Sequence, residues 1–198
     1  MRIGLLGGSF DPVHSAHLAL ATTALATLAL DLVHLIPAGQ PWQRPPLGAS
    51  PTHRLAMMHL AVGTTPGLWV NPIEINRTGP TYTIETLEAL PPGPEYFWIL
   101  GADQLANFCT WRRWDDIAAR VRLVVAQRPG TELAAPEQLE AWLQAHDQTL
   151  VRLPFEPLDV SANEIRQRIG RGESTSDLIP SAVAQYIDNN GLYRQHHA

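Results

Sequence analysis

The segment from Gly4 to His17 constrains the fold of this chain more than any other. The mostly apolar residues 1–6 run into it and predict a buried first strand of a parallel sheet. Residues 16–30 follow it with Ala, Leu and Thr and without Gly or Pro, which predicts a helix of four turns. The segment therefore lies at the C-terminal end of a first strand, where open parallel sheets bind ligands.

The residue types between this strand and this helix fit a phosphate site. Gly7 and Gly8 allow the backbone to turn sharply and to approach a ligand closely. The N–H groups and the dipole of the next helix favour an anion at its start. His14 and His17 are three residues apart, so they share one face of the first turn and can both donate to that anion. We expect residues 11–12 to fix the loop, with Asp11 as a capping or turn residue.

Other interpretations of this segment are possible. A glycine pair often follows a first strand without binding a nucleotide. Two histidines at this spacing could also be half of a metal site, but no third ligand is placed nearby in the sequence. Gly4, Gly7 and Gly8 do not form the G-x-G-x-x-G fingerprint of dinucleotide-binding folds. A P-loop is excluded because the chain contains no lysine.

Composition predicts a soluble globular enzyme with a single domain over residues 1–198. Apolar residues make up 45% of the chain and charged residues 17%. A net charge of −5 argues against binding nucleic acid, and the single cysteine, Cys109, excludes an internal disulfide and a cysteine-cluster zinc site. Polar residues interrupt the apolar run 18–36, so no membrane span is expected, and no leader segment is recognised. We expect a cytoplasmic protein.

The remaining sequence alternates between predicted strands and helices, which indicates a parallel α/β sheet flanked by helices. Further strands are predicted at 32–36, 68–70 with an extension toward 75, 96–100, 121–126 and 149–153. Further helices are predicted at 51–60, 83–90, 136–145, 162–169 and 181–189. The irregular, proline-rich residues 37–51 predict a functional loop.

A second anion site is predicted at the start of the helix 162–169. Ser161 is a plausible N-cap with Glu164 three residues later, which is the pattern of a capping box. Arg166 on the first turn can bind a phosphate with two parallel hydrogen bonds. The simpler interpretation, a capped helix without a ligand, stays open at this point.

The sequence G-G-S-F-D-P-V-H-S-A-H from Gly7 to His17 resembles the signature G-G-(S/T)-F-D-P-x-H-x-G-H of nucleotidyltransferases that transfer an adenylyl group from ATP. Its particular form resembles bacterial nicotinate-nucleotide adenylyltransferases, except that Ala16 stands where the family has Gly. The resemblance implies a Rossmann-like nucleotidyltransferase fold with catalytic His14, His17 and Arg166. It implies an ATP site built from Gly7, Gly8, Ser9, Phe10, His14, His17, Gly101, Asp103, Ser161 and Arg166.

Residues 159–166 resemble the family motif I-S-x-T-x-I-R, with Asn163 in place of Thr. The C-terminal helices from about residue 161 would thus complete the ATP site. Residues 190–194 also resemble the end of the family's sequences.

Four other segments resemble motifs of the acceptor site. Residues 41–46 resemble P-P-H-(K/R), although Trp42 and Gln43 depart from it, and residues 80–83 resemble the P-(S/T)-Y-T motif that holds the nicotinate carboxylate through backbone N–H groups of a helix start. Residues 101–103 resemble the G-x-D turn that binds ribose, and residues 110–111 the T-W pair whose ring stacks on the pyridine. The implied substrate-binding residues are Arg44, Thr81, Tyr82, Thr83, Asp103 and Trp111.

Each of these residues also has a purely structural interpretation. A tryptophan such as Trp111 is more often part of a core than a stacking platform, and a loop arginine such as Arg44 is usually solvated. Arg112 and Arg113 either attract phosphate or cover a helix surface.

The resemblance implies adenylyl transfer from ATP to nicotinate mononucleotide, which gives nicotinate adenine dinucleotide and pyrophosphate. Mg²⁺ would be bound through the ATP phosphates, because no carboxylate cluster is dedicated to it. The alternatives are another acceptor, such as nicotinamide mononucleotide or phosphopantetheine, and a non-catalytic nucleotide-binding module. The expected partners are these small molecules, without nucleic acid or membrane, and a homodimer would be unremarkable.

Overall fold

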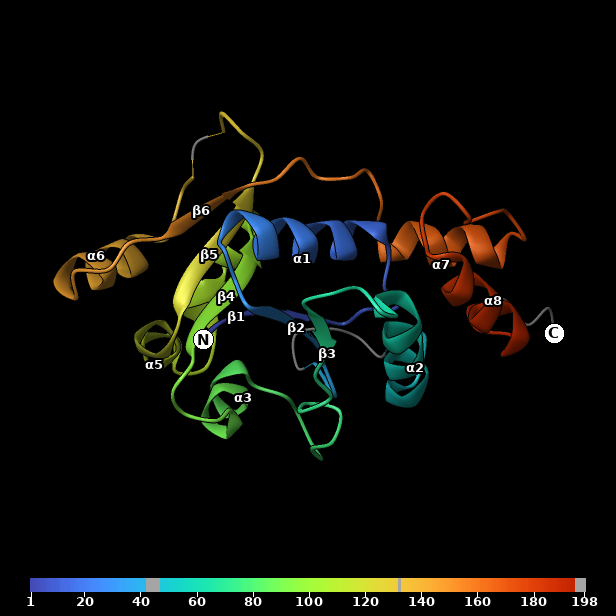
Figure 1. Cartoon of the computed structure of the whole chain (residues 1–198), viewed down its shortest axis with the longest axis horizontal. Helices are drawn as coiled ribbons and strands as arrows, with labels where there is room; N and C mark the ends of the chain where they lie inside the picture. Colours follow the sequence, from blue (N-terminus) through green and yellow to red (C-terminus); the bar gives the residue numbers. More distant parts are fainter. Residues whose placement is uncertain (42–46, 132, 195–198) are drawn as a thin grey trace.

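The computed structural model describes residues 1–41, 47–131 and 133–194. Its centre is a six-stranded parallel sheet in the order β3-β2-β1-β4-β5-β6, with helices on both faces (Figure 1). The parallel α/β fold predicted from the sequence is confirmed, and this strand order is the Rossmann order. The strands are β1 (Arg2–Gly8), β2 (Leu32–Pro37), β3 (Leu68–Val70), β4 (Glu95–Gly101), β5 (Arg122–Gln127) and β6 (Val151–Pro154).

Two hydrophobic clusters cover the two faces of the sheet. Neighbouring residues of a strand point to opposite faces, so Leu6 contributes to one cluster and Leu5 to the other. Helices α1 (Ser15–Thr27), α2 (Pro51–Val62), α7 (Ala162–Gly170) and α8 (Ser181–Asn189) contribute to the first cluster. Helices α3 (Thr83–Ala89), α4 (Ala102–Ala106), α5 (Trp114–Arg120) and α6 (Glu137–Ala145) contribute to the second.

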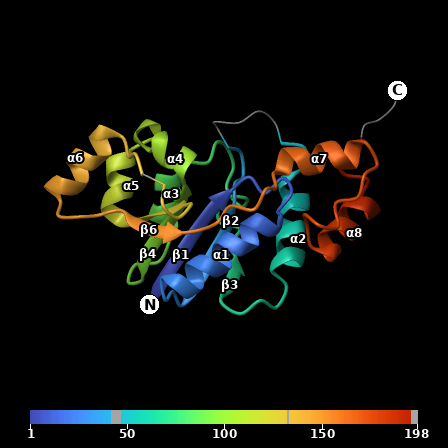
Figure 2. The same ribbon diagram turned by 90° about the horizontal axis from the view of Figure 1, so that it is seen from above.

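The C-terminal helices lie at one end of the molecule and α5 and α6 at the other, as both ribbon views show (Figures 1 and 2). At the C-terminal end, α8 contacts α2. The start of α1 is tied to the same region, because both the backbone N–H and the hydroxyl of Ser15 donate to the carbonyl of Leu178, at 3.0 and 2.9 Å. The C-terminal helices are thus fixed to the start of α1, which follows the loop after β1.

Three details differ from the sequence-based prediction. Helix α1 ends at Thr27 rather than at residue 30, because Ala29 adopts a positive φ of 47° and the chain turns there. Strand β3 does not extend toward residue 75, because the Asn71 side chain accepts from the N–H of Ile73 and bends the backbone. Residues 102–120, where only a strand-to-helix turn at 101–103 was predicted and no helix bounds were given, form α4, α5 and a 3₁₀ turn (Phe108–Thr110).

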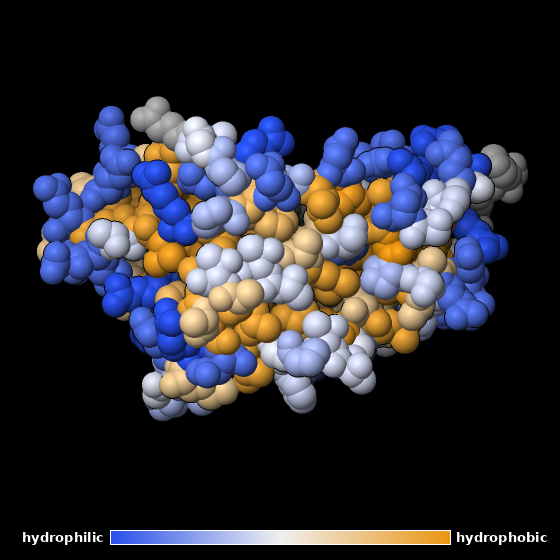
Figure 3. All heavy atoms as spheres, turned by 45° about the horizontal axis from the view of Figure 1, so that its top comes forward, coloured by the Kyte–Doolittle hydropathy of each residue, from blue (hydrophilic) through white to orange (hydrophobic). Residues whose placement is uncertain are grey.

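Hydrophilic residues gather at both ends of the long axis, while apolar residues are exposed over the middle of the face seen in Figure 3. Among the described residues, no helix is long and apolar enough to cross a membrane.

The sheet core predicts a clear difference between two leucine substitutions. Leu35→Ala removes a fully buried side chain in β2 and should lower the free energy of unfolding by about 2–5 kcal/mol. Leu60→Ala is the matched control, because Leu60 is 41% exposed on α2 and its loss should cost about 0.5 kcal/mol or less. Urea denaturation monitored by circular dichroism measures both, and equal losses would contradict the assigned core.

Candidate active site

A cleft of about 690 Å³ opens at the carboxyl ends of β1 and β4. From β1 the chain builds the sheet outward through β2 and β3, and from β4 outward in the other direction, so the cleft lies at the switch point of the fold. Most of the site residues predicted from the sequence line it. These are Gly7, Gly8, Ser9, His14, His17, Thr81, Thr83, Gly101, Asp103, Trp111 and Ser161.

Of the other predicted residues, Phe10, Tyr82 and Arg166 lie outside the lining of the cleft, and Arg44 lies outside the described residues. The buried Phe10 ring packs edge-on against His17 with ring centroids 4.8 Å apart. Tyr82 carries the Arg112 guanidinium over its ring at 4.8 Å. Phe10 thus packs on a residue that lines the cleft, and Tyr82 packs on Arg112, the residue after the lining Trp111.

The glycines at the end of β1 have a different role from the predicted one. Gly7 and Gly8 are part of the extended strand, and the sharp turn falls at Phe10, whose φ is 47°. A Cβ on Gly7 would approach the Trp98 ring to 3.2 Å, and one on Gly8 would approach the Phe10 ring to 3.2 Å. Both contacts are tighter than ordinary packing, so these positions need glycine for close approach and not for a turn.

His14 and His17 are brought together at the start of α1. Their rings stack with centroids 3.7 Å apart and an angle of 27° between the planes. His14 is the N-cap of the helix, and its backbone N–H donates to Nδ1 of His17 at 3.2 Å. Since Nδ1 of His17 is an acceptor there, a neutral His17 carries its proton on Nε2.

Burial controls the charge of His14. The side chain is almost completely buried, and this loss of hydration lowers the pKa of His14 from 6.5 to about 4. Its Nδ1 atom is buried and has no hydrogen-bond partner among the described residues. At neutral pH His14 is therefore an uncharged hydrogen-bonding group in the wall of the cleft.

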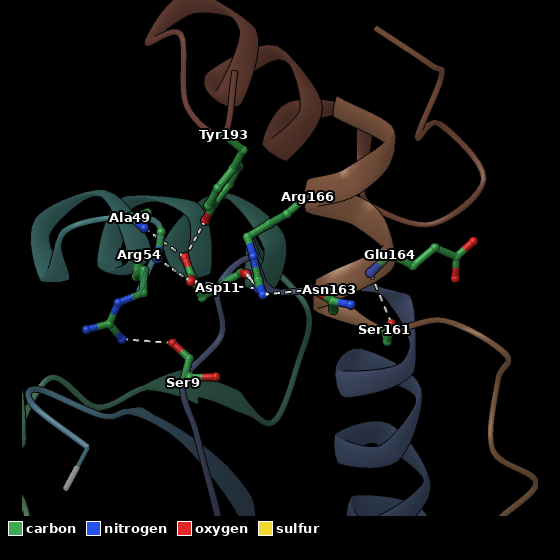
Figure 4. Close-up of polar contacts among 10 residues, drawn as sticks. Ser9, Asp11, Ala49, Arg54, Ser161, Asn163, Glu164, Arg166 and Tyr193 are labelled. Atoms are coloured by element: carbon green, nitrogen blue, oxygen red, sulfur yellow. Dashed lines mark hydrogen bonds and ion pairs between the residues drawn. The ribbon is translucent and has the colours of Figure 1, made fainter. Parts of the chain in front are cut away.

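Asp11 is neither the cap of α1 nor only a turn residue, in contrast to the prediction. Its buried carboxylate accepts from the backbone N–H groups of Gly48 and Ala49 at 2.7 and 2.9 Å, and from the Tyr193 hydroxyl at 2.7 Å (Figure 4). Arg166 donates to the Asp11 carbonyl at 2.6 Å, and its Nη1 lies 3.8 Å from the Asp11 carboxylate. The loop after β1, the start of α2, α7 and the C-terminal segment therefore meet at this residue.

Three further hydrogen bonds fix the loops and the helix start near these residues. The buried Arg54 of α2 donates to the carbonyls of Ser9 and Gly39 at 2.8 and 3.1 Å, which fixes the loops after β1 and β2. Ser161 caps α7 by accepting from the N–H of Glu164 at 3.1 Å, so the predicted N-cap is confirmed.

Thr81, Thr83 and Trp111 also line the cleft. Helix α3 begins at Thr83, as predicted, with Tyr82 as its N-cap. The backbone N–H of Thr81 donates to the carbonyl of Gln40 at 3.0 Å, so this N–H holds the loop after β2. Trp111 packs against Trp98 and Phe108, so it is part of the core as well as of the cleft.

A buried acid in the lining of the cleft was not predicted from the sequence. Glu74 lines the cleft and is 7% exposed, and it accepts from the Thr86 hydroxyl at 2.7 Å. Burial raises the pKa of Glu74, while the hydrogen bond from Thr86 and the nearby Arg77 oppose this rise. Its only sequence signal is an acid in a short polar turn between two Pro residues, which is too common to mark a site.

Other lining residues also escaped the sequence analysis. Gln104 follows Asp103 on α4, and the segment after β6 forms an apolar wall with Phe155, Pro157, Leu158 and Val160.

The predicted pair Arg112 and Arg113 covers the surface, because Arg112 pairs with Glu85 at 3.2 Å and Arg113 with Glu88 and Asp116 at 2.8 and 2.6 Å. Within residues 1–41, 47–131 and 133–194, no group of three or more His, Cys, Asp or Glu side chains is arranged to hold a metal ion.

Comparison with known proteins places this site in a class. The model of the cytidylyltransferase-like family matches residues 5–168, so fold and site define a nucleotidyltransferase domain. A probable nicotinate-nucleotide adenylyltransferase of Bordetella petrii is 61% identical over 193 residues, which cover 98% of this chain and 99% of the relative. A second, from Roseiflexus sp., is 43% identical and covers 97% of this chain. The chain belongs to the nicotinate-nucleotide adenylyltransferase family.

Among solved structures, the nicotinic acid mononucleotide adenylyltransferase of Plasmodium falciparum complexed with NaAD has the same fold. It covers 97% of each chain with a TM-score of 0.73, at 18% sequence identity.

The low pKa of His14 predicts how acid affects stability. Between about pH 6.5 and pH 4 the unfolded chain binds a proton at this histidine and the folded chain does not, so the free energy of unfolding should fall as the pH falls. His14→Asn should remove this part of the pH dependence. His59→Asn, at an exposed position of α2, should keep it. Urea denaturation at a series of pH values measures the slopes, and identical slopes for both variants would contradict the prediction.

Proposed function

We propose that this protein transfers the adenylyl group of ATP to nicotinate mononucleotide and releases nicotinate adenine dinucleotide and pyrophosphate. The observation that carries this proposal is the stacked pair of His14 and His17 beside the glycine backbone of β1 in one cleft. Family membership supports the same reaction. A noncatalytic nucleotide-binding module would need no such pair.

The chemistry needs no nucleophile from the protein. A phosphate oxygen of the mononucleotide attacks the α-phosphorus of ATP, and the bond from this phosphorus to the oxygen that bridges to the β-phosphorus breaks. The two substrates are joined through a new P–O–P bond, and pyrophosphate leaves. Catalysis then consists of positioning and of stabilising the charge on the phosphates.

We assign hydrogen bonding of the ATP phosphates to His14, His17 and the loop amides of residues 8–10. Nε2–H of His17 is the suitable donor, because its Nδ1 is already an acceptor. Arg166 would hold the outgoing pyrophosphate. Its guanidinium donates to the carbonyl of Asp11, which is three residues before His14 in the sequence. Ser161, Gly101 and Asp103 would complete the nucleotide site from the other strands and helices of the cleft.

The acceptor would bind at the other end of the cleft. Trp111 is the candidate platform for the pyridine ring, Asp103 for ribose hydroxyls, and the segment Thr81–Thr83 for the carboxylate. Arg44 is proposed for the acceptor phosphate on the basis of its motif alone.

Mg²⁺ fits this site as a partner of the phosphates. Among the residues that the structure describes, the acidic side chains that line the cleft are Glu74 and Asp103, which are too few for a cation site built from protein carboxylates. The phosphate oxygens of ATP would therefore hold the ion, which neutralises charge on the transferred group. The protein's own contribution is the set of donors described above.

We infer that the whole chain works as one domain, with the C-terminal helices completing the ATP site. The position of Ser161 in the cleft and the contact of Arg166 with Asp11 support this inference. Nicotinamide mononucleotide is the remaining alternative acceptor, and a homodimer stays a prediction that light scattering can test.

His17→Ala should lower turnover by about 10²-fold or more, the scale expected for the loss of one charge-stabilising donor. His59→Ala serves as the matched control, since His59 is exposed on α2 away from the lining of the cleft. Steady-state pyrophosphate release measures both variants. Unchanged turnover in His17→Ala would remove His17 from the mechanism.

The acceptor is tested by pyrophosphate release from ATP and Mg²⁺ with nicotinate or nicotinamide mononucleotide offered separately. We expect strong release with the acid form. Equal use of both acceptors would keep the reaction and remove the selectivity assigned to Thr81–Thr83. Release with neither acceptor would contradict the proposed function.

A further inference from the structure

Tyr193 links the C-terminal segment to the loop after β1, and the reaction as described does not use it. Its hydroxyl donates to Oδ1 of Asp11 at 2.7 Å, across 182 positions of the sequence (Figure 4). Burial raises the pKa of Tyr193, and the hydrogen bond to Asp11 raises it further. The hydroxyl is therefore a donor to Asp11 at every working pH.

The Asp11 carboxylate lies between this hydroxyl and Arg166. Oδ1 accepts from Tyr193 and from the N–H of Ala49, and Oδ2 accepts from the N–H of Gly48. These hydrogen bonds satisfy a carboxylate that is 2% exposed, while Nη1 of Arg166 stays 3.8 Å from Oδ2. A buried carboxylate with fewer donors attracts a neighbouring cation more strongly.

Packing couples the same two side chains. A Cβ on Gly48 would lie 3.0 Å from the Tyr193 ring and 3.3 Å from Cδ of Arg166. Because Gly48 has no side chain, the ring and the arginine side chain both pack on its backbone. The position of Arg166 is thus limited by Tyr193 through Gly48 as well as through Asp11.

We propose that Tyr193 is a positioning residue for adenylyl transfer, which keeps the Arg166 guanidinium available for nucleotide phosphates by occupying Oδ1 of Asp11 and by packing on Gly48. This inference rests on the proposed role of Arg166 in holding the pyrophosphate. Without the hydroxyl, Asp11 draws the guanidinium away from the Asp11 carbonyl and into a closer ion pair than the 3.8 Å one, and the arginine meets the phosphates less well. The effect falls on the nucleotide and not on the acceptor.

The test compares two tyrosines that each lose one hydroxyl. Tyr193→Phe should lower kcat about tenfold and leave the KM for nicotinate mononucleotide within about twofold. Tyr186→Phe is the matched control, because the Tyr186 hydroxyl of α8 hydrogen-bonds His53 of α2 at 3.0 Å and does not contact Asp11. It should keep the wild-type kcat. Thermal melting of both variants checks that they are folded at the assay temperature.

A double-mutant cycle separates positioning of Arg166 from a general structural role. In an Arg166→Ala background, Tyr193→Phe should cause no further loss of kcat, because the residue that it positions is absent. Gly48→Ala gives a second approach that keeps the hydroxyl, since its Cβ pushes on the ring and on Arg166. It should show the same loss of kcat with an unchanged KM for the acceptor.

The outcomes distinguish this inference from the proposed function. Suppose that Arg166→Ala lowers kcat. If Tyr193→Phe then has the same kcat as Tyr186→Phe, the proposed role of Tyr193 is wrong and the proposed reaction stands. The same conclusion follows if the losses of kcat simply add in the double variant. If Gly48→Ala keeps the wild-type kcat, the inference is overturned as well. If Arg166→Ala itself has wild-type kcat, the proposed role of Arg166 fails and the inference fails with it.

Discussion

The pairing of β1 with strands on both of its sides is the constraint on which the rest of the structure depends. β1 hydrogen-bonds in parallel to β2 and to β4, and the chain leaves β1 toward β2 but leaves β4 toward β5, in opposite directions along the sheet. No helix can cover the point between these two exits, and the cleft opens there. The side chains of the cleft come from loops that the sheet brings to one edge, although they are distant in sequence.

The sequence predicts this sheet well because its strands are buried on both faces and read as short apolar runs. The cleft residues contributed by the loops after β1 and β4 were also predicted, since they directly follow such runs. Local patterns did not reveal the role of Asp11, whose partners lie 37, 38, 155 and 182 positions away. They also missed α4 and α5, which are too short for a helical period, and Glu74, whose burial depends on α3 packing over it.

Burial favours the neutral form of two titratable side chains in the cleft, one a base and the other an acid. At the start of α1, burial keeps His14 uncharged beside the His17 ring, which accepts a hydrogen bond from a backbone N–H. In the segment after β3, burial favours the neutral form of Glu74, while the Thr86 hydroxyl favours the charged form. Both groups are therefore set by their surroundings before any substrate arrives, and little reorganisation of charged side chains is needed when phosphates enter.

The edges of the sheet have a consequence for how this protein meets other chains. β3 has only three residues, and β6 has four and ends in Pro154, which has no N–H to donate. An edge this short offers few backbone groups to an added strand, so continuation of the sheet into a second molecule is disfavoured. Assembly of this protein would instead use helix and loop surfaces, and the sheet would stay complete within each molecule.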